Sequence, residues 1–212
     1  MTVKCIIFDC DGTLVDSEQL TNEVIAEMAG ELGIDITGEE ATNMFGGKTL
    51  DAVIYRMKEL SQRDIPEDWL PRLIQKVSDT YKTDLLPMDG IKELLDNVSV
   101  PVCVASNGEP RHVNGSLKLT GLSRYFGENI FTASMVGVPK PAPDLFLYAA
   151  KKMSFRPEEC VVIEDSIPGV TAAVRANIKV YGLIKLCSED ELNNAGAIPF
   201  TNMSELPNLL GI

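Results

Sequence analysis

Hydrophobic and polar residues follow two different patterns along this chain. Residues 3–8 are apolar except for Lys4, and their β-branched and aromatic side chains favour a buried strand over a short helix. Comparable apolar runs predict further strands at residues 100–106, 130–132, 160–163 and 180–184. Helical patterns lie among them, at residues 91–95, 111–119, 144–153, 170–177 and from 188 onward. Strands that alternate with helices predict an α/β fold in which helices cover both faces of a parallel sheet.

Residues 16–84 follow a purely helical pattern. Apolar residues recur there at helical spacing, which predicts three helices, around residues 20–32, 50–57 and 69–81. Thr37-Gly-Glu-Glu40 has the spacing of a capping box, so a further short helix is expected to begin there. No strand is expected in this stretch. The sequence therefore predicts an α/β core formed by residues 1–15 and 85–212, with a helical domain inserted after the first strand.

Composition indicates which partners and which cellular location to expect. The formal net charge of the 212-residue chain is −12, and nucleic acids and anionic membranes attract basic surfaces, so we expect neither as a partner. The five cysteines include no Cys-x-x-Cys pair, and their apolar surroundings favour buried thiols over disulfides. Met1-Thr-Val-Lys leads directly into the first strand, which leaves no room for a signal peptide, and no apolar run is long enough to span a membrane. We therefore expect a cytoplasmic protein.

Polar side chains follow three of the predicted strands. Asp9 and Asp11 come directly after the first strand, Ser106-Asn107-Gly108 ends the second, and Glu164-Asp165-Ser166 follows the strand at 160–163. Because the carboxyl ends of parallel strands lie at one edge of a sheet, these groups are expected to converge. One strand that ends in an acid is ordinary for a solvated loop. Three such endings favour a functional site.

The acidic residues of these endings suit a metal ion. Asp9 and Asp11 are two residues apart, so in extended backbone they point to the same side, and their mutual repulsion calls for a cation or a shared proton. An EF-hand calcium loop is excluded, because its twelfth position requires Glu and here holds Leu20. With Asp165, these carboxylates would offer the hard oxygen ligands that Mg²⁺ prefers.

Other residues of the same loops suit an anion. Ser106 offers a hydroxyl, and the backbone N–H groups of Asn107 and Gly108 precede a helix, where anions bind readily. Lys140 lies in Gly137-Val-Pro-Lys-Pro-Ala-Pro-Asp144, where three prolines stiffen the chain. A lysine is ordinarily a solvated surface residue. Held rigidly before a helix, Lys140 is instead well placed to neutralise a phosphate or the charge of a nucleophile.

Taken together, these motifs resemble the haloacid dehalogenase (HAD) superfamily. They are Asp9-x-Asp11-Gly-Thr-Leu-Val, Ser106, Lys140-Pro-x-Pro and Glu164-Asp165-Ser-x-x-Gly169-x-x-Ala-Ala, in the family's order over essentially the whole chain. The resemblance is to the subgroup that contains β-phosphoglucomutase, phosphoglycolate phosphatase and 6-phosphogluconate phosphatase. It implies a Rossmann-like core with a helical cap domain, here at residues 16–84.

The resemblance also implies a role for each residue. Asp9 would be the nucleophile that forms an aspartyl-phosphate, and Asp11 the acid that protonates the leaving oxygen and then activates water. The Asp9 carboxylate, the Asp11 carbonyl and Asp165 would bind Mg²⁺. Glu164 would lie next to these ligands without binding the ion directly. The transferred phosphate would be held by Ser106, Asn107 and Lys140. These roles agree with the charge neutralisation that phosphoryl transfer requires.

Two alternatives to a phosphatase were weighed. By resemblance, a β-phosphoglucomutase has a His, an Arg and a Lys at positions where this chain has Thr21, Thr49 and Glu109, so a mutase is disfavoured. A non-catalytic HAD protein that serves as a binding module would be expected to lack the nucleophile or the metal-binding acids, all of which are present. His112, the only histidine, is expected to flank a helix start as a surface residue.

The choice of substrate is assigned to the helical cap. The turn Gly46-Gly47-Lys48-Thr49 lies where the subgroup carries its specificity loop, and Lys48 would meet a substrate carboxylate or phosphate, although an ordinary surface lysine is an equally good interpretation. A cap that closes over the site favours small phosphorylated metabolites, such as sugar phosphates or sugar-acid phosphates, over phosphoproteins. A monomer or weak dimer is expected.

Overall fold

The computed structural model describes residues 3–46, 48 and 50–211 and divides into two compact units. One unit joins the chain up to Val15 with the chain from Leu86 onward, and the other comprises Asp16–Leu85. Leu85, which we expected in the core, belongs instead to the helical unit. Its N–H donates to the carbonyl of Tyr81 in the last turn of a helix, and its side chain is buried.

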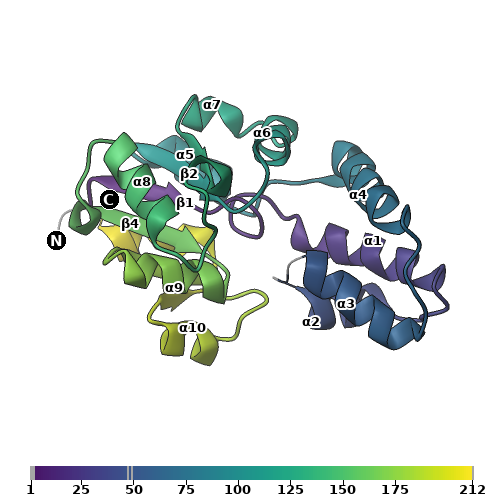
Figure 1. The fold of residues 1–212 in the computed structure, drawn as a ribbon. Coiled ribbons are helices and arrows are strands. Elements are labelled where there is room, and N and C mark those ends of the chain that lie inside the picture. The colour runs from purple at the N-terminus through teal and green to yellow at the C-terminus, as the bar shows by residue number, and fades with distance from the viewer. Residues whose placement is uncertain (1–2, 47, 49, 212) are drawn as a thin grey trace. The chain divides into compact units, whose positions relative to one another are not determined.

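The core unit contains a parallel sheet of six strands in the order β3-β2-β1-β4-β5-β6. Figure 1 shows β1 between β2 and β4. The strands are β1 (Cys5–Phe8), β2 (Val102–Ser106), β3 (Ile130–Thr132), β4 (Cys160–Glu164), β5 (Lys179–Leu183) and β6 (Ile198–Phe200). The parallel α/β fold that the sequence predicted is therefore confirmed. The edge strand β6 was not predicted, because it is three residues long and contains Pro199, which donates no ladder hydrogen bond.

Helices connect these strands, largely where the hydrophobic pattern predicts them. They are α5 (Ile91–Asn97), α6 (Pro110–Leu119), α7 (Ser123–Phe126), α8 (Asp144–Lys152), α9 (Ile167–Arg175), α10 (Glu189–Ala195) and α11 (Leu206–Leu210), with 3₁₀ turns η1 (Ala133–Met135), η2 (Pro157–Glu159) and η3 (Met203–Glu205). The short helices α7 and α11 were not predicted. Each spans little more than one turn, so neither shows a hydrophobic repeat that could be recognised in the sequence.

Side chains of the central strands point alternately to the two faces of the sheet, as a period of two requires. On one face, Ile7 of β1 lies in a buried cluster with residues of α8 and α9. On the other face, the ring of Phe8 meets Phe126 of α7 edge to face, with ring centroids 6.2 Å apart. Burial of each such side chain contributes about 1.5–3 kcal/mol. Both faces of β1 are thus dry, which holds its carboxyl end firmly in place.

The cysteines are free thiols, as the sequence predicted. All are buried except Cys187, which is partly exposed. Burial raises the pKa of the Cys10 thiol well above its usual value, so this neighbour of Asp9 stays protonated at neutral pH. Among the described residues, no helix is both long and apolar enough to cross a membrane.

The described residues of the second unit form helices joined by loops. Its helices are α1 (Glu18–Gly30), α2 (Gly38–Phe45), α3 (Leu50–Ser61) and α4 (Trp69–Asp84). The capping box at the start of α2 is confirmed: the Glu40 N–H donates to Thr37 Oγ1 at 3.2 Å, and the Thr37 N–H donates to Glu40 Oε2 at 2.8 Å. Trp69 is fully buried in this unit's own core, and its indole N–H donates to the carbonyl of Met28 at 3.2 Å.

Candidate active site

The polar strand endings meet at one edge of the core unit. Strand β1 lies between β2 and β4, where the strand order reverses direction, and ligands of open α/β sheets bind outside the carboxyl ends of strands at such a point. Asp9 follows β1 directly, while Ser106 and Glu164 are the last residues of β2 and β4. All three side chains are buried.

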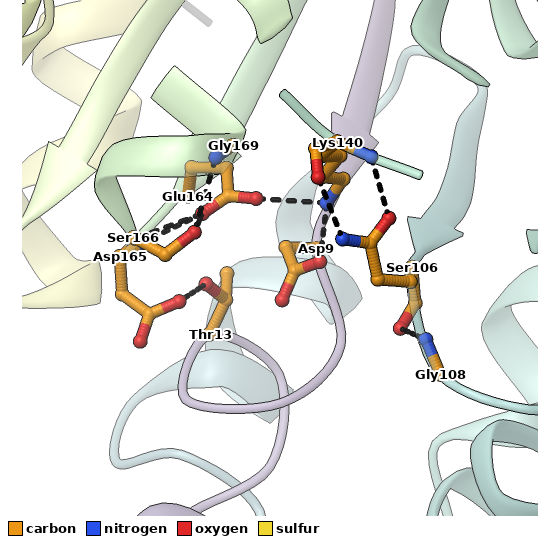
Figure 2. A network of polar contacts seen from close by, with 10 residues as sticks. Asp9, Thr13, Ser106, Gly108, Lys140, Glu164, Asp165, Ser166 and Gly169 are labelled. Atoms are coloured by element: carbon orange, nitrogen blue, oxygen red, sulfur yellow. Dashed lines mark hydrogen bonds and ion pairs between the residues drawn. The ribbon is translucent and has the colours of Figure 1, made fainter. Parts of the chain in front are cut away.

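Lys140 joins two of these strand ends. Its Nζ donates to Asp9 Oδ1 at 2.5 Å and to Glu164 Oε1 at 2.7 Å, so the ammonium lies between the two carboxylates (Figure 2). The residue is only 5% exposed, and its Nζ lies 4.7 Å from the ring centroid of Phe146. Burial lowers the pKa of this ammonium, but the charges of Asp9 and Glu164 more than offset the effect and raise it above its usual range. Lys140 therefore remains charged in the site.

Glu164 is held by donors on both of its oxygens. Oε1 accepts from Lys140, while Oε2 accepts from the Asp165 N–H, the Ser166 N–H and the Ser166 hydroxyl, each at 2.9 Å. The same hydroxyl accepts from the Gly169 N–H and so caps α9. A Cβ atom at Gly169 would lie 1.7 Å from Glu164 Oε1, so only glycine leaves room for this carboxylate.

Asp165 contacts the loop that follows β1. Thr13 is fully buried, and its Oγ1 donates to Asp165 Oδ1 at 3.0 Å (Figure 2). Gly12 has φ +78°, and a Cβ atom there would lie 2.1 Å from Asp165 Oδ2. Thr13 was not among the predicted site residues, although it stands next to Gly12 in the Asp-x-Asp-Gly-Thr motif. It orients an acid that lies 152 positions away.

A cluster of acids at this edge fits a divalent cation. Asp9, Glu164 and Asp165 are buried, and each offers a carboxylate oxygen within 4.8 Å of the others. Burial raises the pKa of Asp9 to about 8, although the charge of Lys140 opposes the rise. The hard carboxylate oxygens of this cluster are of the kind that Mg²⁺ prefers. Because both oxygens of Glu164 already accept hydrogen bonds, Asp9 and Asp165 are the better direct ligands.

The Asp11 side chain lies outside this cluster and meets the only histidine. His112 Nε2 lies 3.1 Å from Asp11 Oδ1, and the hydrogen bond to Asp11 raises the pKa of His112. The two side chains are 36% and 28% exposed. His112 lies in the first turn of α6, as expected, but it is only partly exposed and its contact with Asp11 was not predicted. Nothing in the sequence links residues 101 positions apart, so only the packing of α6 beside the loop after β1 reveals the contact.

The predicted phosphate-binding residues lie around the end of β2. Ser106 is 2% exposed, and its Oγ accepts from the Gly108 N–H at 3.0 Å. The Asn107 side chain contacts the main chain of Lys140, with Oδ1 accepting from the Lys140 N–H at 2.8 Å and Nδ2 donating to its carbonyl at 3.3 Å. The predicted anion-binding residues at the end of β2 and the lysine are thus joined directly.

The predicted specificity residues belong to the helical unit. Gly46 is the C-cap of α2, with its N–H bonded to the carbonyl of Thr42, and Lys48 is exposed. Gly47 and Thr49 lie outside the described residues. Of the other positions used to weigh a mutase, Thr21 has its hydroxyl 2.7 Å from the Tyr81 hydroxyl.

Comparisons with known proteins place this site in a family. The chain is 27% identical to 6-phosphogluconate phosphatase of Escherichia coli, with 98% of this chain and 94% of that protein covered. It is also 27% identical to a phosphorylated carbohydrates phosphatase of Thermotoga maritima, with 98% of both chains covered. The solved structure of a HAD family hydrolase from Deinococcus radiodurans, with bound phosphate and sodium, has a TM-score of 0.87 at 30% identity, covering 99% of this chain and 95% of that one.

The match to the family is broad as well as specific. The model of haloacid dehalogenase-like hydrolases matches residues 3–177, which include both strand β1 and strand β4 with the acids that follow them. The strand order and the acids at the carboxyl edge of the sheet agree with that match. The chain therefore belongs to the haloacid dehalogenase-like hydrolase family.

Proposed function

We propose that this protein is a Mg²⁺-dependent phosphatase that hydrolyses a small phosphorylated metabolite through an aspartyl-phosphate. The observation that carries the proposal is the buried Asp9 carboxylate, which lies beside the Lys140 ammonium and an acidic cluster at the carboxyl edge of the sheet. Phosphoryl transfer needs such a nucleophile among fixed positive charges. The curated relatives, which are named as phosphatases, support the same reaction class.

In the first step, an Asp9 carboxylate oxygen attacks phosphorus and the bond between phosphorus and the ester oxygen breaks. Asp11 donates a proton to the departing oxygen, which leaves as an alcohol. In the second step, water attacks the phosphorus of the aspartyl-phosphate while Asp11 takes up a proton. Inorganic phosphate departs and the Asp9 carboxylate is restored. The contact with His112 would orient the Asp11 carboxyl within the loop that carries the nucleophile.

The charge of the transferred group is met by residues of the core unit. Lys140 supplies an ammonium, Ser106 a hydroxyl and Asn107 a backbone N–H toward the phosphoryl oxygens. Bound to Asp9, Asp165 and the Asp11 carbonyl, Mg²⁺ would neutralise phosphate charge and keep Asp9 ionised. The bonds that Glu164 makes to Lys140 and to the Asp165 N–H would hold both the ammonium and the ligand loop in register.

The nucleophile is tested by Asp9→Asn, which preserves the shape of the side chain and removes its nucleophilic charge. We expect a loss of turnover on the order of 10⁴-fold or more. The measurement is phosphate release from p-nitrophenyl phosphate and from a panel of sugar phosphates, sugar-acid phosphates and phosphoglycolate. Asn114→Ala on the exposed face of α6 is the control and retains wild-type turnover. Normal activity of Asp9→Asn would refute the proposal.

We further propose a sugar phosphate or sugar-acid phosphate as the substrate, with Lys48 contributing to its recognition. The two relatives are named as phosphatases of 6-phosphogluconate and of phosphorylated carbohydrates, which supports this class. Lys48→Ala is expected to raise KM for the preferred metabolite about tenfold and to leave p-nitrophenyl phosphate unaffected. Lys58→Ala, on another exposed lysine of the helical unit, is the matched control. Equal losses on both substrates would contradict a role for Lys48 in specificity.

A further inference from the structure

Both polar ends of the Asn107 amide are bonded to the main chain of one residue, Lys140. Oδ1 accepts from the Lys140 N–H at 2.8 Å, and Nδ2 donates to the Lys140 carbonyl at 3.3 Å. A single side chain from the end of β2 thus satisfies the donor and the acceptor of a residue 33 positions away. This pair of hydrogen bonds resembles the paired backbone bonds between two β-strands. It fixes both the position and the rotation of the Lys140 peptide groups.

The segment around Lys140 needs support from outside. Pro139, Pro141 and Pro143 have no backbone N–H, so residues 139–143 have few donors with which to build structure of their own. The Ala142 N–H donates to the Pro139 carbonyl within the segment, while other bonds to its main chain come from Asn107, from Arg175 and from α8. Arg175 at the end of α9 donates to the Pro141 carbonyl at 3.0 Å.

The ammonium at the end of the same residue has little freedom. Its Nζ is bound to Asp9 and Glu164 and lies over the ring of Phe146. Displacing the main chain of Lys140 would therefore move the ammonium relative to the nucleophile. A displacement of about 1 Å of a group that positions a reaction costs on the order of 100-fold in rate.

We propose that Asn107 is a positioning residue whose side chain clamps the main chain of Lys140 and thereby sets the ammonium against the transferring phosphoryl group. The inference rests on the proposed phosphatase function. The alternative role for the Asn107 side chain is a direct bond to the phosphate, since this residue is exposed at the site. The clamp also keeps the Ser106 hydroxyl and the Lys140 ammonium in one fixed arrangement, since Asn107 directly follows Ser106.

A double-mutant cycle separates the two roles. Asn107→Ala, Lys140→Ala and the double variant are compared with the wild type by kcat/KM for p-nitrophenyl phosphate. Calorimetric affinity for inorganic phosphate in the presence of Mg²⁺ provides a second readout. We expect Asn107→Ala to lower kcat/KM about 10- to 100-fold in the wild type and less than about threefold in the Lys140→Ala background. A side chain that acts only through Lys140 has nothing left to position once the ammonium is gone.

Arg175→Ala provides a second route, because Lys140→Ala leaves two buried carboxylates without their ammonium and so threatens folding. The Arg175 guanidinium bonds to the Pro141 carbonyl in the same segment. We expect Arg175→Ala to lower kcat about tenfold, and its combination with Asn107→Ala to give less than the product of the single losses. Asn114→Ala is the matched control, since its amide also bonds to a backbone carbonyl but lies away from Lys140.

The outcomes separate the clamp from the proposed function. Equal fold-losses from Asn107→Ala with and without Lys140, or an unaffected kcat in Arg175→Ala, overturn the clamp while leaving the phosphatase in place. A folded wild type that releases phosphate from no ester overturns the proposed function itself. Strong non-additivity in an active enzyme supports the clamp.

Discussion

At the scale of single residues, the site depends on the balance of charges around Lys140. One ammonium lies between Asp9 and Glu164, and Asp165 adds a third buried carboxylate to the group. Breaking such a buried pair by removing one partner costs about 3–5 kcal/mol, because the other charge is left uncompensated. Burial, together with the charge of Glu164, raises the pKa of Asp9 to about 8 although the charge of Lys140 opposes the rise. A cation that arrives with or before the substrate would complete the balance.

Gly169 is the residue whose replacement tests this arrangement most directly. A methyl group in Gly169→Ala would collide with Glu164 Oε1, which is held by its bond to Lys140 and cannot move without breaking it. We expect a loss of about 1–3 kcal/mol in the free energy of unfolding and a loss of turnover larger than that destabilisation explains. Urea unfolding and phosphate release measure the two effects.

Gly115→Ala in α6 is the matched control for this substitution. A Cβ atom at Gly115 meets nothing within 4 Å, so the variant is expected to gain up to about 1 kcal/mol from the higher helix propensity of alanine. If Gly169→Ala behaved like Gly115→Ala, the tight packing of Glu164 against α9 would matter for neither stability nor turnover.

At the scale of elements, Lys4, which precedes β1, bonds to Glu159, which precedes β4. The Lys4 N–H donates to the Glu159 carbonyl at 2.9 Å, and Lys4 Nζ donates to Glu159 Oε1 at 2.8 Å. The next residues, Cys5 and Cys160, are paired in the parallel register. Because β1 and β4 carry Asp9 and Asp165 at their far ends, this register decides whether the two acids lie side by side.

The same contact predicts a pH dependence of stability. The bond from Lys4, with those from Arg156, lowers the pKa of Glu159 from 4.5 to about 2. A depressed folded-state pKa adds stability that is fully present above about pH 4.5 and is lost as the pH falls toward about 2. We expect Glu159→Gln to be less stable than the wild type at pH 7, with a difference that shrinks between these two pH values. Urea unfolding at pH 7 and pH 3 measures it.

Glu158→Gln controls for the change in net charge. Its carboxylate contacts Arg156, whose side chain is 70% exposed, and such surface pairs contribute about 0–1 kcal/mol. A Glu159→Gln variant whose deficit stayed constant from pH 7 to pH 3 would show that the carboxylate charge has no part in joining β1 to β4.

At the scale of the whole molecule, metal binding should link the chemistry to the stability of the core unit. The acids of the cluster come from the ends of β1 and β4, so a bound ion joins segments that are far apart in the sequence. EDTA is expected to abolish phosphate release and Mg²⁺ to restore it. Mg²⁺ at 100 times its Kd should also stabilise the protein by about 2.7 kcal/mol, seen as a higher unfolding temperature.

Asp165→Asn is the variant that assigns this effect to the cluster. The substitution retains an oxygen that can accept from Thr13, yet removes a ligand charge. We expect it to lose both the activity and the stabilisation by Mg²⁺. Turnover that persists in EDTA would remove the metal from the mechanism, whereas stabilisation that persists in Asp165→Asn would locate the ion elsewhere.

The sequence by itself determined the elements and the chemical character of the site. Continuous apolar runs and helical repeats reflect local burial, and the capping box at Thr37 is made of local bonds, so all could be predicted from neighbouring residues. The polar residues that follow three of the predicted strands likewise predicted one edge of the sheet. Only very short elements such as β6 and α7 were missed, because they are too brief to show a period.

Tertiary structure decided how the site residues are connected. The contacts of His112 with Asp11, Thr13 with Asp165 and Asn107 with Lys140 join residues 101, 152 and 33 positions apart. Their partners are set by strand order and by the packing of helices and loops at the sheet edge, and no local pattern encodes them. Sequence therefore identified which groups carry the charge. The fold determined which of them bond to one another, because hydrogen bonds depend on distances that only packing fixes.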